Sequence, residues 1–183
     1  DLRDFVAGLK LVLKPDGIIT VEFPHLLRLM EGNQFDTIYH EHFSYFSFCT
    51  VENIFASHGL AIFDVEEIQT HGGSLRVYAG HAGGGALKPH LRVSELRERE
   101  KAAGIYKLET YTCFGERVRE TKRALLEFLI GLKRNSNSVV GYGAPAKGNM
   151  LVNYCGIGTD FLDYTVDISP HKQNHFLPGS HIP

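Results

Sequence analysis

One stretch near the end of the sequence restricts the fold more than any other. Ser138 to Gly143 reads as an apolar strand that runs into a glycine turn, and Ala144 to Tyr154 continues as a helix. Tyr164 to Asp167 then reads as a second strand. A strand, a glycine turn, a helix and a further strand begin a β-α-β unit, which is built on parallel strands. The sequence therefore predicts an α/β protein.

The glycine turn of this unit is a candidate phosphate site. Gly141 and Gly143 let backbone N–H groups and the start of the helix approach a phosphate, and Lys147 adds a positive charge. We expect the turn from Gly143 to Asn149 to hold phosphates or adjacent groups, and Asp167 to hold a ribose hydroxyl. The spacing is neither GxGxxG nor that of a P-loop. A plain tight turn, with glycines needed only for packing, is therefore an equally good interpretation.

A second candidate site lies in residues 34–45, which hold two His, one Glu, one Asp and two Tyr. Tyr39, Glu41 and His42 could all serve proton transfer near neutral pH. The interleaved aromatic residues, such as Phe43, predict that the stretch is partly buried, and partly buried ionisable groups collect at functional sites. A polar surface strip is the simpler alternative, but the density of apolar residues favours a site.

The beginning of the chain predicts a helix followed by a strand. Apolar residues from Leu2 to Leu13 recur at helical spacing, residues 14–17 form a turn, and residues 18–23 form a mostly apolar strand. Such a strand is expected inside a sheet that is covered on both faces. We therefore interpret this part as the end of a doubly wound domain.

The next region predicts a helix and a pair of strands. Thr50 fits the N-cap of a helix over residues 51–58. Strands are predicted over residues 60–65 and 74–79, and the glycine turn at residues 71–73 between them indicates antiparallel pairing.

Three consecutive glycines, residues 83–85, are the expected domain boundary. Residues 91–133 are predicted to be helical, with Gly104 and Gly115 as candidate breaks. Their charges are expected on solvated faces. The residues expected on the apolar face are Tyr106, Phe114, Val118, Leu125, Phe128 and Leu132.

Composition excludes several classes of function. The net charge of -2 leaves no electrostatic footprint for nucleic acid or for an anionic membrane. No apolar run reaches the roughly 18 residues that a transmembrane helix requires. Cys49, Cys113 and Cys155 show no CxxC spacing, and we interpret them as reduced core thiols in a cytoplasmic protein.

Four motifs in order give the sequence a family resemblance. They are Tyr39–Ser47 (YHEHFSYFS), His71–Val77 (HGGSLRV), Gly141–Asn149 (GYGAPAKGN) and Pro170–Gln173 (PHKQ). Together they resemble the S-adenosylmethionine-dependent sugar C-methyltransferases, which act on nucleotide-linked deoxyketosugars. The resemblance implies that residues 1–82 end a methyl-donor domain and contain the catalytic stretch. It also implies that residues 83–183 form a helical segment and an incomplete Rossmann-like C-terminal domain that helps to hold the nucleotide sugar.

The resemblance also implies roles for particular residues. His42 is expected to be the general base that removes a proton beside the ketone, with Tyr39 and Glu41 orienting or hydrogen-bonding the sugar. His40 and His71 are expected to bind substrate. If the stretch is extended, His40 and His42 share one face while Tyr39 and Glu41 share the other, so convergence requires a bend.

The sequence departs from the family pattern in the part that binds the methyl donor. The upstream glycine-rich motif and the amino-terminal cysteine-rich zinc module are absent, so we expect a fragment that is inactive alone, with the S-adenosylmethionine site mostly outside it. Two other classes stay open. One is a metal enzyme that uses residues 40–42, although the spacing is not HExxH. The other is a nucleotide-binding Rossmann-like module or an NAD(P)-dependent oxidoreductase fragment.

Overall fold

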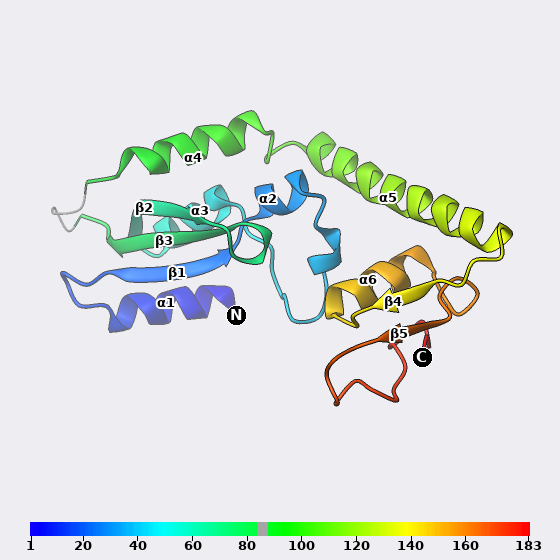
Figure 1. Cartoon of the computed structure of the whole chain (residues 1–183). Helices are drawn as coiled ribbons and strands as arrows, with labels where there is room; N and C mark the ends of the chain where they lie inside the picture. Colours follow the sequence, from blue (N-terminus) through cyan, green and yellow to red (C-terminus); the bar gives the residue numbers. More distant parts are fainter. Residues whose placement is uncertain (84–87) are drawn as a thin grey trace. The chain divides into compact units, whose positions relative to one another are not determined.

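The computed structural model describes residues 1–83 and 88–183 and has a mixed α/β architecture, as the sequence predicted. By backbone contacts the chain divides into two compact units. The first comprises Asp1–Gln34 and Ser44–Tyr111, and the second comprises Phe35–Phe43 and Thr112–Pro183. The elements (Figure 1) are α1 (Leu2–Val12), β1 (Ile19–Pro24), α2 (Leu26–Glu31), η1 (Phe35–Thr37), α3 (Phe48–Ser57), β2 (Leu60–Ile68), η2 (Thr70–Gly72), β3 (Ser74–His81), α4 (Leu91–Ala102), α5 (Leu108–Arg134), β4 (Val140–Tyr142), α6 (Ala146–Cys155) and β5 (Tyr164–Val166).

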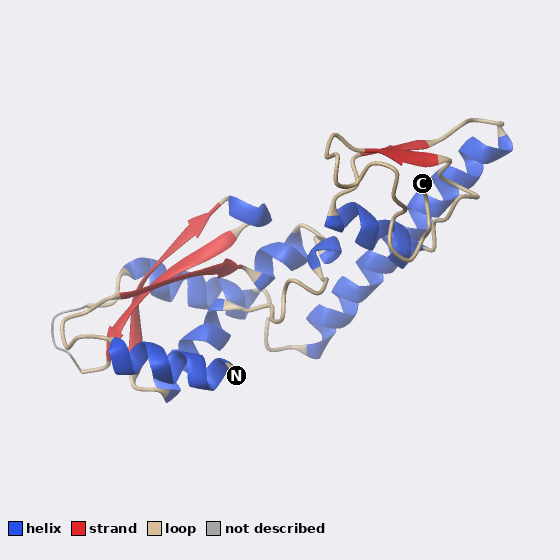
Figure 2. Ribbon diagram, turned by 90° about the horizontal axis from the view of Figure 1, so that it is seen from below, coloured by secondary structure: helices blue, strands red, loops and turns tan. Residues whose placement is uncertain are grey.

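The first unit is built on a three-stranded antiparallel sheet with the order β1-β3-β2. The predicted hairpin is confirmed, because β2 and β3 pair on either side of the η2 turn. Its core is formed by buried residues of the sheet together with buried residues of α1, α3 and α4. Figure 1 shows α4 running alongside β2, and Figure 2 shows how much longer these strands are than β4 and β5.

The burial of β1 differs from the expectation of a sheet covered on both faces. Ile19 and Phe23 are buried, whereas Glu22 between them is exposed. Glu22 and Glu66 stand opposite Arg76 on the two neighbouring strands, and Arg76 forms ion pairs with them at 3.1 and 3.9 Å. Among the described residues this antiparallel sheet therefore follows the one-sided pattern, with an apolar face and a charged face.

The start of α3 corrects one predicted cap. Ser47, rather than Thr50, is the N-cap, and its side chain accepts a hydrogen bond from the Thr50 N–H. Thr50 thus occupies the N3 position, which supplies the donor in this arrangement. Both residue types favour caps, so sequence preference alone did not distinguish them.

The long helical region breaks only once. Gly104, with φ at +76°, lies between α4 and α5, whereas Gly115 lies inside α5. The expectation that charges here are solvated is wrong for Glu100, which is 0% exposed. Tyr106 and Phe128, both expected on the apolar face, are 67% and 61% exposed, and Leu129 beside Phe128 is buried instead.

In the second unit, α6 follows β4 and precedes β5 along the chain, and the two strands pair in parallel. The predicted β-α-β order is confirmed. The core of this unit contains Leu129 from α5, Val152 and Cys155 from α6, and Ile182 near the end of the chain. Cys49 and Cys155 are buried free thiols as predicted, but Cys113 is exposed.

Two further expectations concern the domain boundary and membrane-spanning helices. Residues 84–87 lie outside them, so the boundary at residues 83–85 stays a prediction; within the described part, α4 belongs to the first unit. None of the helices in residues 1–83 and 88–183 is both long enough and apolar enough to cross a membrane.

Candidate functional site

The predicted proton-transfer residues lie on a bend. The His42 N–H donates a 3.0 Å hydrogen bond to the Tyr39 carbonyl, so His40 and Glu41 occupy the centre of a tight turn. The turn brings the rings of Tyr39 and His42 edge to face, with centroids 5.2 Å apart and an interplanar angle of 77°. The bend that convergence required is therefore present, and it brings Tyr39 and His42 together.

Burial of this loop is weaker than the sequence suggested. Tyr39 and His42 are half-buried, His40 and Glu41 are exposed, and Phe43 is 96% exposed. The expectation that the aromatic residues bury this stretch is therefore wrong for Phe43. The loop is attached through the preceding η1, whose Phe35 ring lies 5.1 Å from the ring of Tyr154 on α6.

The glycine turn between β4 and α6 has a conformation that requires glycine. Gly143 has φ at +89°, in the left-handed region, and its N–H donates to the Val166 carbonyl at 2.7 Å. Pro145 is the N-cap of α6 and provides no side-chain cap. The first N–H groups of a helix have no intrahelical partner, and the Pro145 side chain cannot cap those of α6. These groups are therefore suited to bind an anionic ligand.

Asp167, which follows β5, is held by this turn. Its Oδ2 accepts from the Ala144 N–H at 2.8 Å and from the Lys172 ammonium at 3.2 Å, and its Oδ1 accepts from the Ser169 N–H at 2.8 Å. The hydrogen bonds from the Ser169 and Ala144 N–H groups, with that from Lys172, lower the pKa of Asp167 to about 2. The carboxylate is ionised at neutral pH, and both its oxygens are already engaged.

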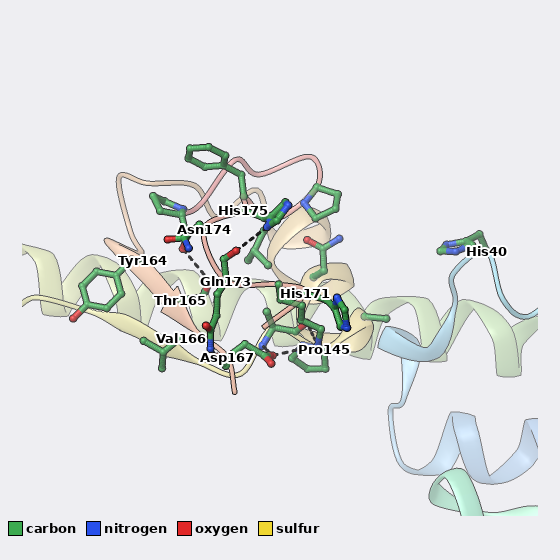
Figure 3. Close-up of a pocket in the computed structure, with 18 residues that line it drawn as sticks. His40, Pro145, Tyr164, Thr165, Val166, Asp167, His171, Gln173, Asn174 and His175 are labelled. Carbon is green, nitrogen blue, oxygen red and sulfur yellow. Dashed lines mark hydrogen bonds and ion pairs between the residues drawn. The ribbon is translucent and has the colours of Figure 1, made fainter. Parts of the chain in front are cut away.

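A cavity of about 970 Å³ joins these features within the second unit. This volume lies at the upper end of the usual range for small-molecule sites. Three of the predicted site residues line it: His40, Asn149 and Asp167. Figure 3 shows His171 beside Pro145, close to Asp167, and His40 at the far side of the cavity. The other lining residues are Ala144, Pro145, Ala146, Tyr164, Thr165, Val166, His171, Lys172, Gln173, Asn174, His175, Phe176, Leu177, Pro178 and Pro183.

The family of C-methyltransferase C-terminal domains matches residues 69–183. The chain belongs to the C-methyltransferase family. C-methyltransferase NovU from Streptomyces niveus is 39% identical to it over 185 residues, which cover 100% of this chain and 43% of NovU. The chain thus spans less than half the length of that relative and corresponds to its C-terminal part. The resemblance seen in the four motifs is confirmed, and the finding favours a transferase over the oxidoreductase alternative.

Six predicted site residues of this C-methyltransferase chain do not line the cavity: Tyr39, Glu41, His42, His71, Gly143 and Lys147. Lys147 is the second residue of α6 and is half-buried, and neither it nor Gly143 is among the lining residues. The cation that does line the cavity is Lys172. Lys172 is part of the Pro170–Gln173 motif, to which the sequence analysis gave no role at this site. Its closeness in sequence to Asp167, five residues earlier, was the one feature that could have indicated that the two side chains pair.

His71 belongs to the first unit, whereas Tyr39 and His42 belong to the second. His71 is exposed, with φ at +53°, in a turn that Gly72 and Gly73 continue with φ at +84° and +124°. The glycine requirement of this hairpin turn is confirmed. Its closeness to Tyr39 and His42 stays a prediction.

The metal-enzyme alternative concerned residues 40–42. Within residues 1–83 and 88–183, no group of three or more His, Cys, Asp and Glu side chains is arranged to hold a metal ion.

Proposed function

We propose that this chain is the substrate-binding and proton-transferring part of an enzyme that methylates a carbon beside the ketone of a nucleotide-linked deoxysugar. One observation carries the proposal: a single cavity is lined by His40 from the Tyr39–His42 bend and by residues at the start of α6. A ligand in this cavity would have one end at His40, which lies beside the proposed acid–base residues in the chain, and the other at a helix N-terminus suited to phosphate.

The bend accounts for the chemistry that the substrate needs. The imidazole of His42 takes the proton from the carbon beside the ketone, and the electron pair of that C–H bond moves to form the enolate. Tyr39, whose ring meets that of His42 at 5.2 Å, and Glu41 at the centre of the turn hydrogen-bond and orient the sugar. His40 and His71 contact the sugar nucleotide. The enolate carbon is then the nucleophile for methylation.

The proposed methyl donor is S-adenosylmethionine, which supplies an electrophilic methyl group. The described residues do not fit a site for it. The sheet of the first unit is antiparallel, whereas ligand sites of doubly wound folds form at the carboxyl ends of parallel strands. The parallel pair β4–β5 adjoins the cavity assigned to the sugar nucleotide. We therefore assign the donor to residues outside this chain and derive no step through it.

We also propose a fold type for each of the two units. The helix-then-strand order of α1 and β1 is compatible with the end of a doubly wound donor domain, and the parallel β4–α6–β5 arrangement is compatible with the start of a Rossmann-like domain. In that interpretation the proposed acid–base residues and the proposed nucleotide site belong to the same, second unit.

The phosphate assignment predicts the effect of one substitution. Lys147 does not line the cavity, but it lies in the first turn of α6, beside the helix N-terminus assigned to phosphate. In this assignment its ammonium reaches the phosphates, so Lys147→Ala should weaken the binding of thymidine or uridine diphosphate about tenfold. Isothermal titration calorimetry measures the affinity. Lys101→Ala is the matched control, since it removes the same charge from a side chain that is 71% exposed on α4. Equal affinities of Lys147→Ala and wild type, with unchanged circular dichroism, contradict the assignment.

A further inference from the structure

We propose that Asp167 and Lys172 are positioning residues which together hold Ala144, and through it the wall of the cavity formed by Pro145 and Ala146, in the shape that binds the nucleotide. The inference rests on the proposed function, since it concerns the same cavity. It gives Asp167 a role through the protein backbone in place of a direct bond to a ribose hydroxyl.

Ala144 is held on both sides by this pair. Its N–H donates to Asp167 Oδ2 at 2.8 Å, and its carbonyl accepts from the Lys172 ammonium at 2.9 Å. The same ammonium donates to Asp167 Oδ2 at 3.2 Å, so the three groups close a small ring of hydrogen bonds. The strength of such charge-assisted bonds makes Ala144 the best-anchored residue of the turn.

The pair also ties down the loop after β5. Asp167 Oδ1 accepts from the Ser169 N–H at 2.8 Å, and the Gln173 side-chain amide donates to the Asp167 carbonyl at 3.0 Å. Asp167 remains a carboxylate throughout the physiological range, because the hydrogen bonds from the Ser169 and Ala144 N–H groups and from Lys172 lower its pKa to about 2. Residues of both the loop and the turn line the cavity, and one carboxylate connects the two segments (Figure 3).

The backbone on either side of Ala144 explains why its position matters. Gly143 has no Cβ, so its backbone resists rotation little and can adopt its positive φ, whereas the ring of Pro145 fixes its own φ at -76°. A rotation at Ala144 would therefore move Pro145 and the first turn of α6 as one body. The opposite charges of Asp167 and Lys172 cancel locally, so the pair acts on a ligand through this geometry more than through its field.

A double-mutant cycle tests the pair. Lys172→Met, Asp167→Asn and the double variant are titrated with thymidine diphosphate and uridine diphosphate by calorimetry, and the exchange of the Ala144 amide proton is followed by NMR. Each single variant should bind about tenfold more weakly and exchange Ala144 faster, and the double variant should bind no worse than the weaker single variant. Lys172→Arg can donate to the Ala144 carbonyl and to Asp167 Oδ2, as Lys172 does. It should therefore recover affinity to within about threefold of wild type.

The second unit offers a matched control. Lys133 and Asp163 form a comparable pair at 2.7 Å, and Asp163 accepts from the Val139 N–H before β4, away from the cavity lining. Lys133→Met should leave nucleotide affinity unchanged. Additive losses in the double variant mean that Asp167 and Lys172 contact the ligand independently, and this overturns the inference, as does wild-type affinity in either single variant. If wild type itself binds neither nucleotide, the nucleotide site of the proposed function is refuted together with the role of the pair.

Discussion

Glu100→Ala is expected to lower the free energy of unfolding by about 3–5 kcal/mol, the usual result of removing one partner from a buried, hydrogen-bonded carboxylate network. Glu100 lies on α4 with its side chain 0% exposed, and its Oε1 meets His25 Nε2 at 2.8 Å. It also accepts from the backbone N–H groups of Phe48 at 2.6 Å and Cys49 at 2.9 Å, at the start of α3. One carboxylate thus connects α4, α3 and the residue before α2.

The loss has two causes, and a second variant separates them. Alanine leaves a void and removes the acceptor for three buried donors, whereas Glu100→Gln keeps the volume. A glutamine offers one acceptor oxygen and places an NH2 group near an N–H donor, so we expect it to cost about 2 kcal/mol or more. Denaturant unfolding followed by circular dichroism measures both values.

A matched control lies on the same helix. Glu98, whose side chain is 69% exposed, forms only a 4.0 Å pair with Lys101. Glu98→Ala should change the free energy of unfolding by less than about 0.5 kcal/mol. Similar effects at both positions would show that Glu100 does not hold the first unit together.

Glu100 should also make the free energy of unfolding depend on pH in the acidic range. Burial alone would raise the pKa of Glu100, but hydrogen bonds from His25, Cys49 and Phe48 outweigh it and hold the pKa below the ordinary value of 4.5. A lowered folded pKa means that the stabilisation is fully present above the unfolded pKa and is lost as the pH falls through the folded one. Below about pH 4.5, wild-type stability should therefore fall more steeply than that of Glu100→Gln.

Local features of the fold were predictable because their causes are local. The helix of α1 and the strand–turn–helix around Gly143 follow from apolar spacing and from glycine at a positive φ. The cap of α3 was assigned to Thr50 instead of Ser47, since the two residues have similar capping preferences.

Long-range features were not predictable from the sequence. Glu100 reads as one charge among many on a solvated helix, and only the tertiary fold brings it to His25, 75 residues away. The bend that brings Tyr39 to His42 contains no Gly or Pro, the residues from which a turn can be predicted. The association of Lys172 with Ala144 likewise depends on the parallel pairing of β4 and β5.

The largest expected effect on activity concerns the base. His42→Asn should slow proton removal beside the ketone by at least about 100-fold, because a general base in place contributes that much or more. Because His42 is only half-buried and does not line the cavity, we expect the fold and the nucleotide affinity to survive the change. His40→Asn is the comparison, and as a change to a cavity-lining residue it should weaken substrate affinity while leaving exchange at saturating substrate near the wild-type rate.

Solvent deuterium exchange tests the central claim most directly. It is measured on the full-length enzyme with a nucleotide-linked ketosugar and S-adenosylhomocysteine in deuterated water, where no methyl group can be transferred. The wild type should exchange the proton beside the ketone, and His42→Asn should bind the sugar nucleotide normally but lose that exchange. Exchange at the wild-type rate in His42→Asn would contradict the account and make Glu41 or His40 the next candidate for the base.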